Sequence, residues 1–159
     1  MSVETVIEDI RWAPSLEALS SRAIPAALAH LSIGEGYVVV MGCDDARIAA
    51  LNADFRGKPA ATNVLSWPSQ ERRAAKDGAT PKAPSHSELG DLALAFETCA
   101  REAHAQSKTF DAHVTHLLIH GTLHLLGYDH ERTADAELME RLEIEILGKM
   151  GYGDPYSTD

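Results

Sequence analysis

Three histidines in the segment HGTLHLLGYDH, residues 120–130, stand at spacings that suit metal binding. Successive helical residues are about 100° apart, so His120 and His124 project from one face, separated by about 40°. Two imidazoles at this i, i+4 spacing can hold one metal ion. Gly127 then allows the left-handed turn that ends a helix and brings His130 back from a loop. The segment predicts three nitrogen ligands and one open position, the layout of a catalytic zinc site.

The residue after the first histidine separates this site from that of a zinc protease. The spacing HxxxHxxGxxH matches the metzincin pattern, but the glutamate that serves as general base in those enzymes is replaced by Gly121. Zinc lowers the pKa of bound water to about 7, and the hydroxide can attack a carbonyl, an amidine carbon or a phosphoryl group. Without the glutamate, peptide hydrolysis lacks its usual general base, and phosphoryl transfer becomes the alternative reaction. It needs a cation for the developing charge, and Arg56 is our candidate.

The same helix carries two further histidines that complicate the ligand assignment. His116 lies one turn before His120 on the same face, so these two could in principle form the metal-binding pair. Only His120 and His124 are followed by the glycine turn and a third histidine. We interpret His113 and His116 as packed or hydrogen-bonding side chains. Buried histidines without metal are the alternative for the whole set, and three imidazoles would also suit nickel or copper.

Composition and cysteine content predict an ordinary globular domain. The chain has 159 residues, of which 45% are hydrophobic and 24% charged, enough for one domain with a core. Cys43 and Cys99 form no CxxC pair and are expected to be buried free thiols in a reducing cytosol. Residues 1–12 are acidic, unlike a signal peptide, and the apolar stretch 114–127 is too short to span a bilayer. We predict a cytoplasmic location and no membrane partner.

Charge is distributed unevenly along the chain. The formal net charge of −10 argues against a nucleic-acid partner. However, residues 56–82 hold six basic and two acidic side chains, whereas residues 129–159 hold three basic and nine acidic ones. The first segment could therefore form a basic face on an acidic molecule. The alternative is a solvated loop whose charge is incidental.

Hydrophobic periodicity predicts four short strands interleaved with helices, a small domain of mixed α and β structure. The expected strands are 3–12, 36–41, 62–67 and 89–96. The expected helices are 15–31, broken or kinked at Pro25, then 44–55 capped by Asp44 or Asp45, 97–107, 111–126 and 133–149. Residues 69–87 form a long basic loop that we expect to be flexible, because a loop of this length is usually functional or disordered.

Three blocks together resemble the YbeY family of bacterial endoribonucleases. They are HGTLHLLGYDH at 120–130, LNADFRGKPAATNVLSWP at 51–68 and LGD at 89–91. The blocks follow the family's order, and the resemblance covers most of residues 44–148. The loop 69–87 departs from the family, whose connection there is shorter and acidic.

The resemblance implies an α+β fold, in which residues 1–159 form a single domain with a mixed four-stranded sheet packed with helices. A zincin-like helix would carry one Zn²⁺ per chain, held by His120, His124 and His130. The family's functionally important arginine falls on Arg56, the candidate catalytic residue. The implied activity is cleavage of single-stranded RNA, in 3′-end processing of small-subunit rRNA and ribosome quality control. The implied partners are rRNA and the ribosomal small subunit with its assembly proteins.

Four other polar residues are candidates for supporting roles, each with a local alternative. Lys58 could contact phosphates beside Arg56. The alternative for Arg56 is a surface ion pair. Asn63 could contact substrate or cap a turn. Asp91 could accept a hydrogen bond from a metal-bound imidazole or lie at a strand edge, and Asp129 could orient a ligand or shape its turn.

Two other functions remain open from the residues alone. One is a ribosome-associated RNA-binding or assembly factor whose zinc is mainly structural. The other is a zinc hydrolase of a non-RNA substrate such as an amide, against which the missing glutamate counts. Glu131 is a candidate displaced general base.

Overall fold

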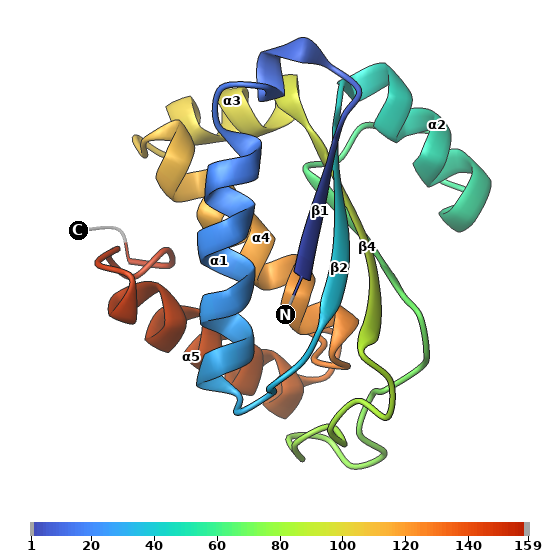
Figure 1. Cartoon of the computed structure of the whole chain (residues 1–159), viewed down its shortest axis with the longest axis vertical. Coiled ribbons are helices and arrows are strands. Elements are labelled where there is room, and N and C mark those ends of the chain that lie inside the picture. The colour runs from blue at the N-terminus through green and yellow to red at the C-terminus, as the bar shows by residue number, and fades with distance from the viewer. Residues whose placement is uncertain (1, 158–159) are drawn as a thin grey trace.

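Four strands form one mixed sheet in the computed structural model, which describes residues 2–157 (Figure 1). They are β1 (Ser2–Ile7), β2 (Tyr37–Cys43), β3 (Val64–Pro68) and β4 (Glu88–Ala95). The spatial order is β1-β2-β4-β3. The pairs β1–β2 and β2–β4 are parallel, and β3 runs antiparallel to β4. The expected α+β fold with a mixed four-stranded sheet is confirmed.

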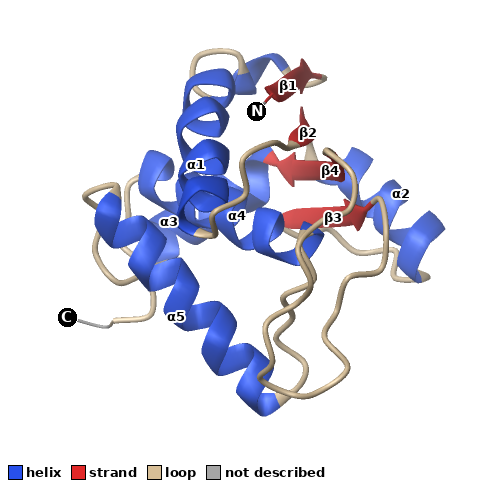
Figure 2. Cartoon of the chain, turned by 60° about the horizontal axis from the view of Figure 1, so that its bottom comes forward, coloured by secondary structure: helices blue, strands red, loops and turns tan. Residues whose placement is uncertain are grey.

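Helices cover the two faces of the sheet unequally. They are α1 (Leu16–His30), α2 (Asp45–Arg56), α3 (Phe96–Ala105), α4 (Phe110–Leu125) and α5 (Thr133–Lys149). Helices α1 and α4 lie against one face with α5 outside them, and α2 lies alone on the other side (Figures 1 and 2). None of the helices in residues 2–157 is long and apolar enough to cross a membrane.

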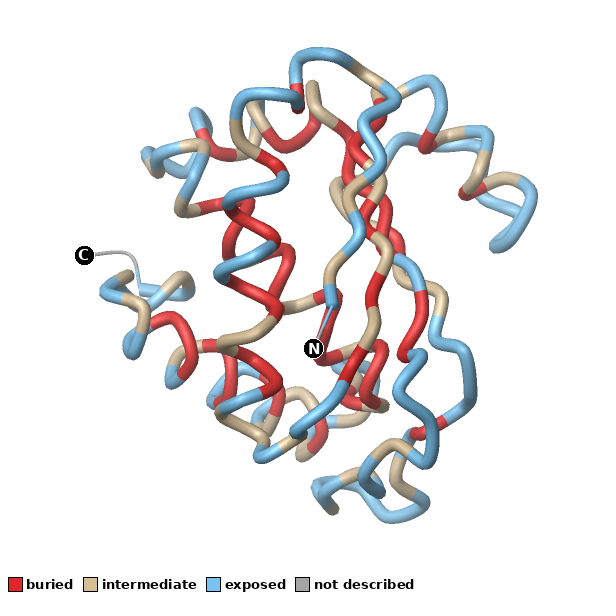
Figure 3. Tube along the Cα trace, in the orientation of Figure 1, coloured by how far each residue is buried: buried red, intermediate tan, exposed pale blue. Residues whose placement is uncertain are grey.

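Helix α4 is the central helix of the larger layer. It contacts α1, α3, α5 and strands β3 and β4. Its sequence is apolar on nearly all sides, as expected for a helix enclosed by protein. Val114, Leu118, Ile119 and Leu123 are all fully buried in the main core, which Figure 3 shows concentrated between the sheet and these helices. The histidine segment 120–130 therefore begins on a buried helix.

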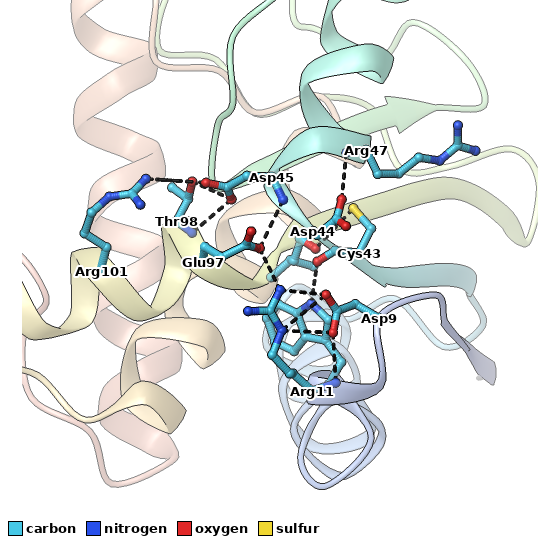
Figure 4. A network of polar contacts seen from close by, with 11 residues as sticks. Asp9, Arg11, Cys43, Asp44, Asp45, Arg47, Glu97, Thr98 and Arg101 are labelled. Atoms are coloured by element: carbon cyan, nitrogen blue, oxygen red, sulfur yellow. Dashed lines mark hydrogen bonds and ion pairs between the residues drawn. The ribbon is translucent and has the colours of Figure 1, made fainter.

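Reciprocal caps join the start of α2 to the start of α3 (Figure 4). The carboxylate of Asp45 accepts hydrogen bonds from the backbone N–H and the hydroxyl of Thr98, at 3.0 and 2.8 Å. The carboxylate of Glu97 in turn accepts from the backbone N–H of Asp45 at 3.1 Å. Asp44 caps α2 itself, accepting from the N–H of Arg47 at 2.8 Å. These bonds satisfy N–H groups that a helix leaves unpaired and fix where α2 begins.

Two expected elements differ from the structure. The first strand does not run to Trp12 but ends at Ile7, because the Asp9 side chain accepts from the N–H of Arg11 and starts a 3₁₀ turn at Ile10–Trp12. The Trp12 indole then donates to the Cys43 carbonyl at 2.9 Å. Helix α1 runs unbroken through Pro25. Packing of the buried residues on either side outweighs the hydrogen bond that proline cannot make.

Both cysteines lie in the buried part of the described chain. Cys43 and Cys99 are free thiols with no exposed surface, as expected. They come from β2 and α3. Neither contributes to a metal-binding cluster among the described residues.

Candidate metal centre

The three histidines of the motif converge at the end of α4. The Nε2 atoms of His120 and His124 are 3.1 Å apart, and one nitrogen from each of His120, His124 and His130 lies within 4.8 Å of the others. Imidazoles bound to a tetrahedral zinc at about 2.0–2.1 Å place neighbouring nitrogens about 3.3 Å apart. The three histidines could therefore hold one metal ion with three imidazole ligands.

Gly127 makes the turn that brings His130 back to the helix. Its φ is +100°, and a Cβ built on it would lie 2.4 Å from the Arg72 carbonyl oxygen. Only glycine fits both the conformation and the space. The carboxylate of Asp129 then accepts the backbone N–H of His130 at 2.7 Å. Asp129 thus shapes the turn that positions the third ligand.

Burial and neighbouring imidazoles keep His124, the middle histidine of the motif, neutral. Burial, and to a lesser extent the nearby His120 and His130, lower the pKa of His124 to about 4. A neutral imidazole offers a nitrogen lone pair, which is the form that binds metal. His130 lies at the exposed end of the turn, and His120 and His124 are partly buried.

A buried glutamate on α5 contacts His120, the first histidine of the motif. Glu143 is fully buried, and its Oε2 accepts from the Nδ1 of His120 at 2.9 Å. Burial raises the pKa of Glu143, but hydrogen bonds from His116 and His120 outweigh this and bring it to about 2. Glu143 is not among the site residues predicted from the sequence. One signal could have revealed it, because it is the acidic member of an otherwise apolar helical stripe, Met139, Leu142, Ile146 and Leu147.

The two remaining histidines of α4 make hydrogen bonds, as interpreted from the sequence. His113 contacts the Oε1 of Glu102 through its Nε2 at 2.9 Å, and His116 contacts Glu143. Burial lowers the pKa of His113. Neither side chain belongs to the group formed by His120, His124 and His130, although His116 and His120 share Glu143.

Gly121 lies against the sheet, where any larger side chain would press on the buried Leu92. A Cβ there would be 2.8 Å from a methyl carbon of Leu92 and 3.4 Å from the Ser66 hydroxyl. The helix face that carries the glutamate in the protease motif is here packed on β3 and β4. The close packing of α4 on the sheet therefore favours glycine over glutamate at position 121.

A cleft of about 430 Å³ opens beside the histidines. His124 and His130 line it together with Arg56, which comes from the last turn of α2. The other lining side chains are mostly polar, and they include Ser66, Glu71, Arg72, Arg73, Asp129 and Glu131. The structure thus brings the candidate arginine and two of the predicted metal ligands to one cleft.

Three other candidate residues lie elsewhere among the described residues. Lys58 is exposed and does not line this cleft. Asn63 donates to Glu102 at 3.0 Å and accepts from the N–H of Val64 at 2.7 Å, which occupies its amide within the fold. Asp91 is exposed on β4, and no hydrogen bond joins it to a histidine of the described chain. Their proposed contacts with substrate or with imidazoles stay predictions.

The basic loop 69–87 is tied to the metal-binding turn at several points. Arg72 is 9% exposed and donates to the Leu125 carbonyl at 2.8 Å and to the Leu89 carbonyl at 3.3 Å. Asp77 caps α5 by accepting from the N–H of Asp135 at 2.8 Å. Arg73 remains at the surface, near carboxylates of the turn. Not all of the loop's basic charge therefore forms an exposed face.

Comparisons with known proteins agree with this architecture. A family profile described as Endoribonuclease YbeY matches residues 3–151. Proteins of that description from Paracoccus denitrificans and a Ruegeria species are 56% and 53% identical to this chain. The alignments cover 97% and 98% of this chain and 89% and 96% of the relatives, respectively.

A solved structure supports the fold independently. The solution structure of a Thermotoga maritima protein superposes with a TM-score of 0.59 at 23% sequence identity, covering 94% of this chain and 92% of that one. At this identity the likeness concerns the fold alone. Together with the full-length sequence matches, these findings show that the chain belongs to the Endoribonuclease YbeY family.

Proposed function

We propose that this chain is a zinc-dependent endoribonuclease that cleaves single-stranded RNA. The observation that carries the proposal is a group of three imidazoles within 4.8 Å of one another, two of which line a polar cleft together with Arg56. Its membership of the Endoribonuclease YbeY family supports RNA as the substrate class. The packing at Gly121 disfavours peptide hydrolysis, because the general base of zinc proteases has no place there.

Each residue of the site has a role that follows from its position. His120, His124 and His130 would hold the ion, which when bound supplies a Lewis acid and a water of lowered pKa. Arg56 carries a permanent charge and would stabilise the phosphate oxygens as negative charge develops. Glu131 lines the same cleft and is the carboxylate we propose for proton transfer.

The proposed biological role is 3′-end maturation of small-subunit rRNA and ribosome quality control in the cytoplasm. The cleft mixes basic side chains, Arg56 and Arg73, with acidic ones, Asp129 and Glu131. The whole chain has a formal net charge of −10, so its general field repels RNA. We therefore infer that the ribosomal small subunit and its assembly proteins present the RNA strand to the cleft.

Single-turnover cleavage of a labelled single-stranded RNA tests this proposal. We expect His124→Ala, chelator treatment and Arg56→Ala each to slow cleavage by about 100-fold or more. Arg47→Ala is the matched control, because Arg47 is exposed on the same helix and pairs with Glu8 instead of lining the cleft. A duplex of the same sequence should remain intact.

Two outcomes would contradict parts of the proposal separately. If the wild type cuts RNA no faster than His124→Ala, the nuclease activity is wrong. A zinc ion that is required for folding, together with RNA binding but no cleavage, would then favour an assembly factor. If Arg56→Ala retains the full rate, the role of Arg56 is wrong while the metal centre stands.

A further inference from the structure

The carboxylate of Glu143 receives three donors inside the protein. Its Oε2 faces the Nδ1 of His120 at 2.9 Å, and its Oε1 receives both the Nε2 of His116 and the hydroxyl of Tyr156. The Glu143 side chain is 1% exposed. A buried carboxylate is costly unless its oxygens are paired in this way, so the cluster is a built feature of the fold.

The bond to Glu143 determines which nitrogen of His120 faces the metal. The Oε1 of Glu143 receives the Tyr156 hydroxyl and the His116 Nε2, which leaves Oε2 as the acceptor for the Nδ1–H of His120, so this contact favours the ring proton on Nδ1. In the neutral ring, the lone pair is then on Nε2. Nε2 is the atom that lies 3.1 Å from the Nε2 of His124. The glutamate thus selects the tautomer and ring orientation that suit a metal ligand.

The same cluster has the composition of a second metal site. Ligand atoms of His116, His120 and Glu143 lie within 4.8 Å of one another. However, both carboxylate oxygens and the facing imidazole nitrogens already form hydrogen bonds with one another. A second ion would have to break these bonds and would compete with the first ion's support. The geometry therefore favours a cluster that orients His120 over one that binds a second metal ion.

The C-terminal segment, residues 150–157, closes this cluster. Its Tyr156 reaches back to the glutamate, and its ring meets the His116 ring edge-on with centroids 5.4 Å apart. The ammonium group of Lys108 holds the neighbouring Pro155 carbonyl at 2.7 Å. A segment beyond the last helix thus contacts the residue that orients a metal ligand.

We propose that Glu143 is a positioning residue of the metal centre, holding His120 with Nε2 toward the ion, and that Tyr156 holds Glu143 in place. This rests on the proposed function only in requiring that the three histidines bind metal. The predicted metal content is one ion per chain. The predicted consequence is that metal affinity depends on α5 and on the C-terminal segment, neither of which supplies a ligand.

Zinc affinity, measured by competition with a chelating dye, tests the proposal. Glu143→Met keeps the side-chain size but removes the acceptor, and we expect Zn²⁺ binding about 10–100-fold weaker. Glu143→Gln retains one acceptor oxygen and should restore part of this loss. Tyr156→Phe removes one donor only and should weaken binding by a smaller factor, severalfold at most.

Two control variants match these changes in kind. Glu137→Gln removes a charge from an exposed position of α5, and Tyr152→Phe removes a hydroxyl from the chain just after α5. Both should bind Zn²⁺ with wild-type affinity. In metal-free wild type, ¹⁵N spectra should show the His120 proton on Nδ1, and Glu143→Met should change this signal.

The outcomes separate this inference from the proposed function. Unchanged Zn²⁺ affinity in folded Glu143→Gln and Tyr156→Phe, even with lowered thermal stability, would show a purely structural role and overturn the inference. Two zinc ions per wild-type chain would overturn it as well. If the wild type binds no zinc, the metal centre and the proposed function fail together. Should Glu143→Met not fold, Glu143→Gln and Tyr156→Phe decide the question.

Discussion

The two sides of His120 differ in almost every physical respect. On the closed side, its Nδ1 meets a fully buried glutamate that also binds His116 and Tyr156. On the open side, its Nε2 faces His124 and the cleft-lining turn. The closed side has short hydrogen bonds within protein, whereas the open side has nitrogens directed toward one another. The hydrogen bond at Nδ1 holds the His120 ring in place, with its Nε2 directed toward the proposed metal site.

The surroundings of the two sides differ in the same way. Around the cleft, Arg73 is 46% exposed and lies 3.7 and 3.8 Å from the carboxylates of Asp129 and Glu131. Exposed ion pairs of this kind contribute about 0–1 kcal/mol to stability, because water screens them. We therefore expect changes in the packed region to lower stability and changes at the cleft surface to alter function alone.

Gly121→Glu, which would restore the protease motif, should have the largest effect. The new side chain would enter the packed contact with Leu92 and place an unpaired carboxylate there. We expect a loss of about 3 kcal/mol or more in the free energy of unfolding, measured by urea denaturation, and no peptidase activity. Gly148→Glu is the control, because a side chain at Gly148 meets nothing within 4 Å. A stable Gly121→Glu variant that cleaves peptides would break the comparison.

Gly127→Ala tests the boundary between the two sides. The added Cβ would collide with the Arg72 carbonyl oxygen at 2.4 Å in a left-handed conformation. We expect about 2–4 kcal/mol of destabilisation and weaker Zn²⁺ binding, since His130 must move. Gly151→Ala has a similar φ of +91° with open space around it, so it should lose only about 1 kcal/mol. Equal losses in the two variants would show that the contact with Arg72 is unimportant.

The open side could largely be predicted from the sequence because its signals are local. The spacing of His120 and His124 is one helical turn, and Gly127 marks the turn that returns His130. The need for a cation in phosphoryl transfer and the family resemblance both indicate Arg56, and the cleft that it lines with His124 and His130 shows only that it lies near them. Its role in catalysis stays a prediction.

The closed side could not be predicted because its contacts join distant residues. Glu143 is 23 residues from His120, and only the apolar stripe of α5 hints that it is buried. The charge pattern places Arg72 in a basic segment, predicted as either a basic face or a solvated loop, yet it donates to backbone carbonyls of β4 and α4. Every residue has a carbonyl, so no residue type in the sequence marks such an acceptor.

Arg72→Met should have the next largest effect on stability. The substitution keeps an apolar stem but leaves the Leu125 carbonyl and the Ser69 hydroxyl without their donor. We expect about 1–3 kcal/mol of destabilisation by urea denaturation and faster proteolysis within residues 73–87, because the loop loses its buried anchor. A loop as protease-resistant as that of the wild type would show that the other contacts, such as the Asp77 cap, suffice.

Arg73→Met, one position further on, should have the smallest effect on stability. Its guanidinium is half-exposed and its ion pairs are long, so we expect unfolding free energy to change by less than about 0.5 kcal/mol. Because Arg73 lines the cleft, binding of single-stranded RNA should weaken, and the slope of log affinity against log salt should fall by about 0.7, one phosphate contact. Arg22→Met, on the exposed side of α1, serves as the control for loss of one charge.

If Arg73→Met destabilises the protein as much as Arg72→Met, the contrast between packed and open sides does not hold. If the Arg73→Met variant binds RNA as tightly as the wild type at every salt concentration, Arg73 contributes only to the ion pairs of the turn. The phosphate contacts must then come from Arg56.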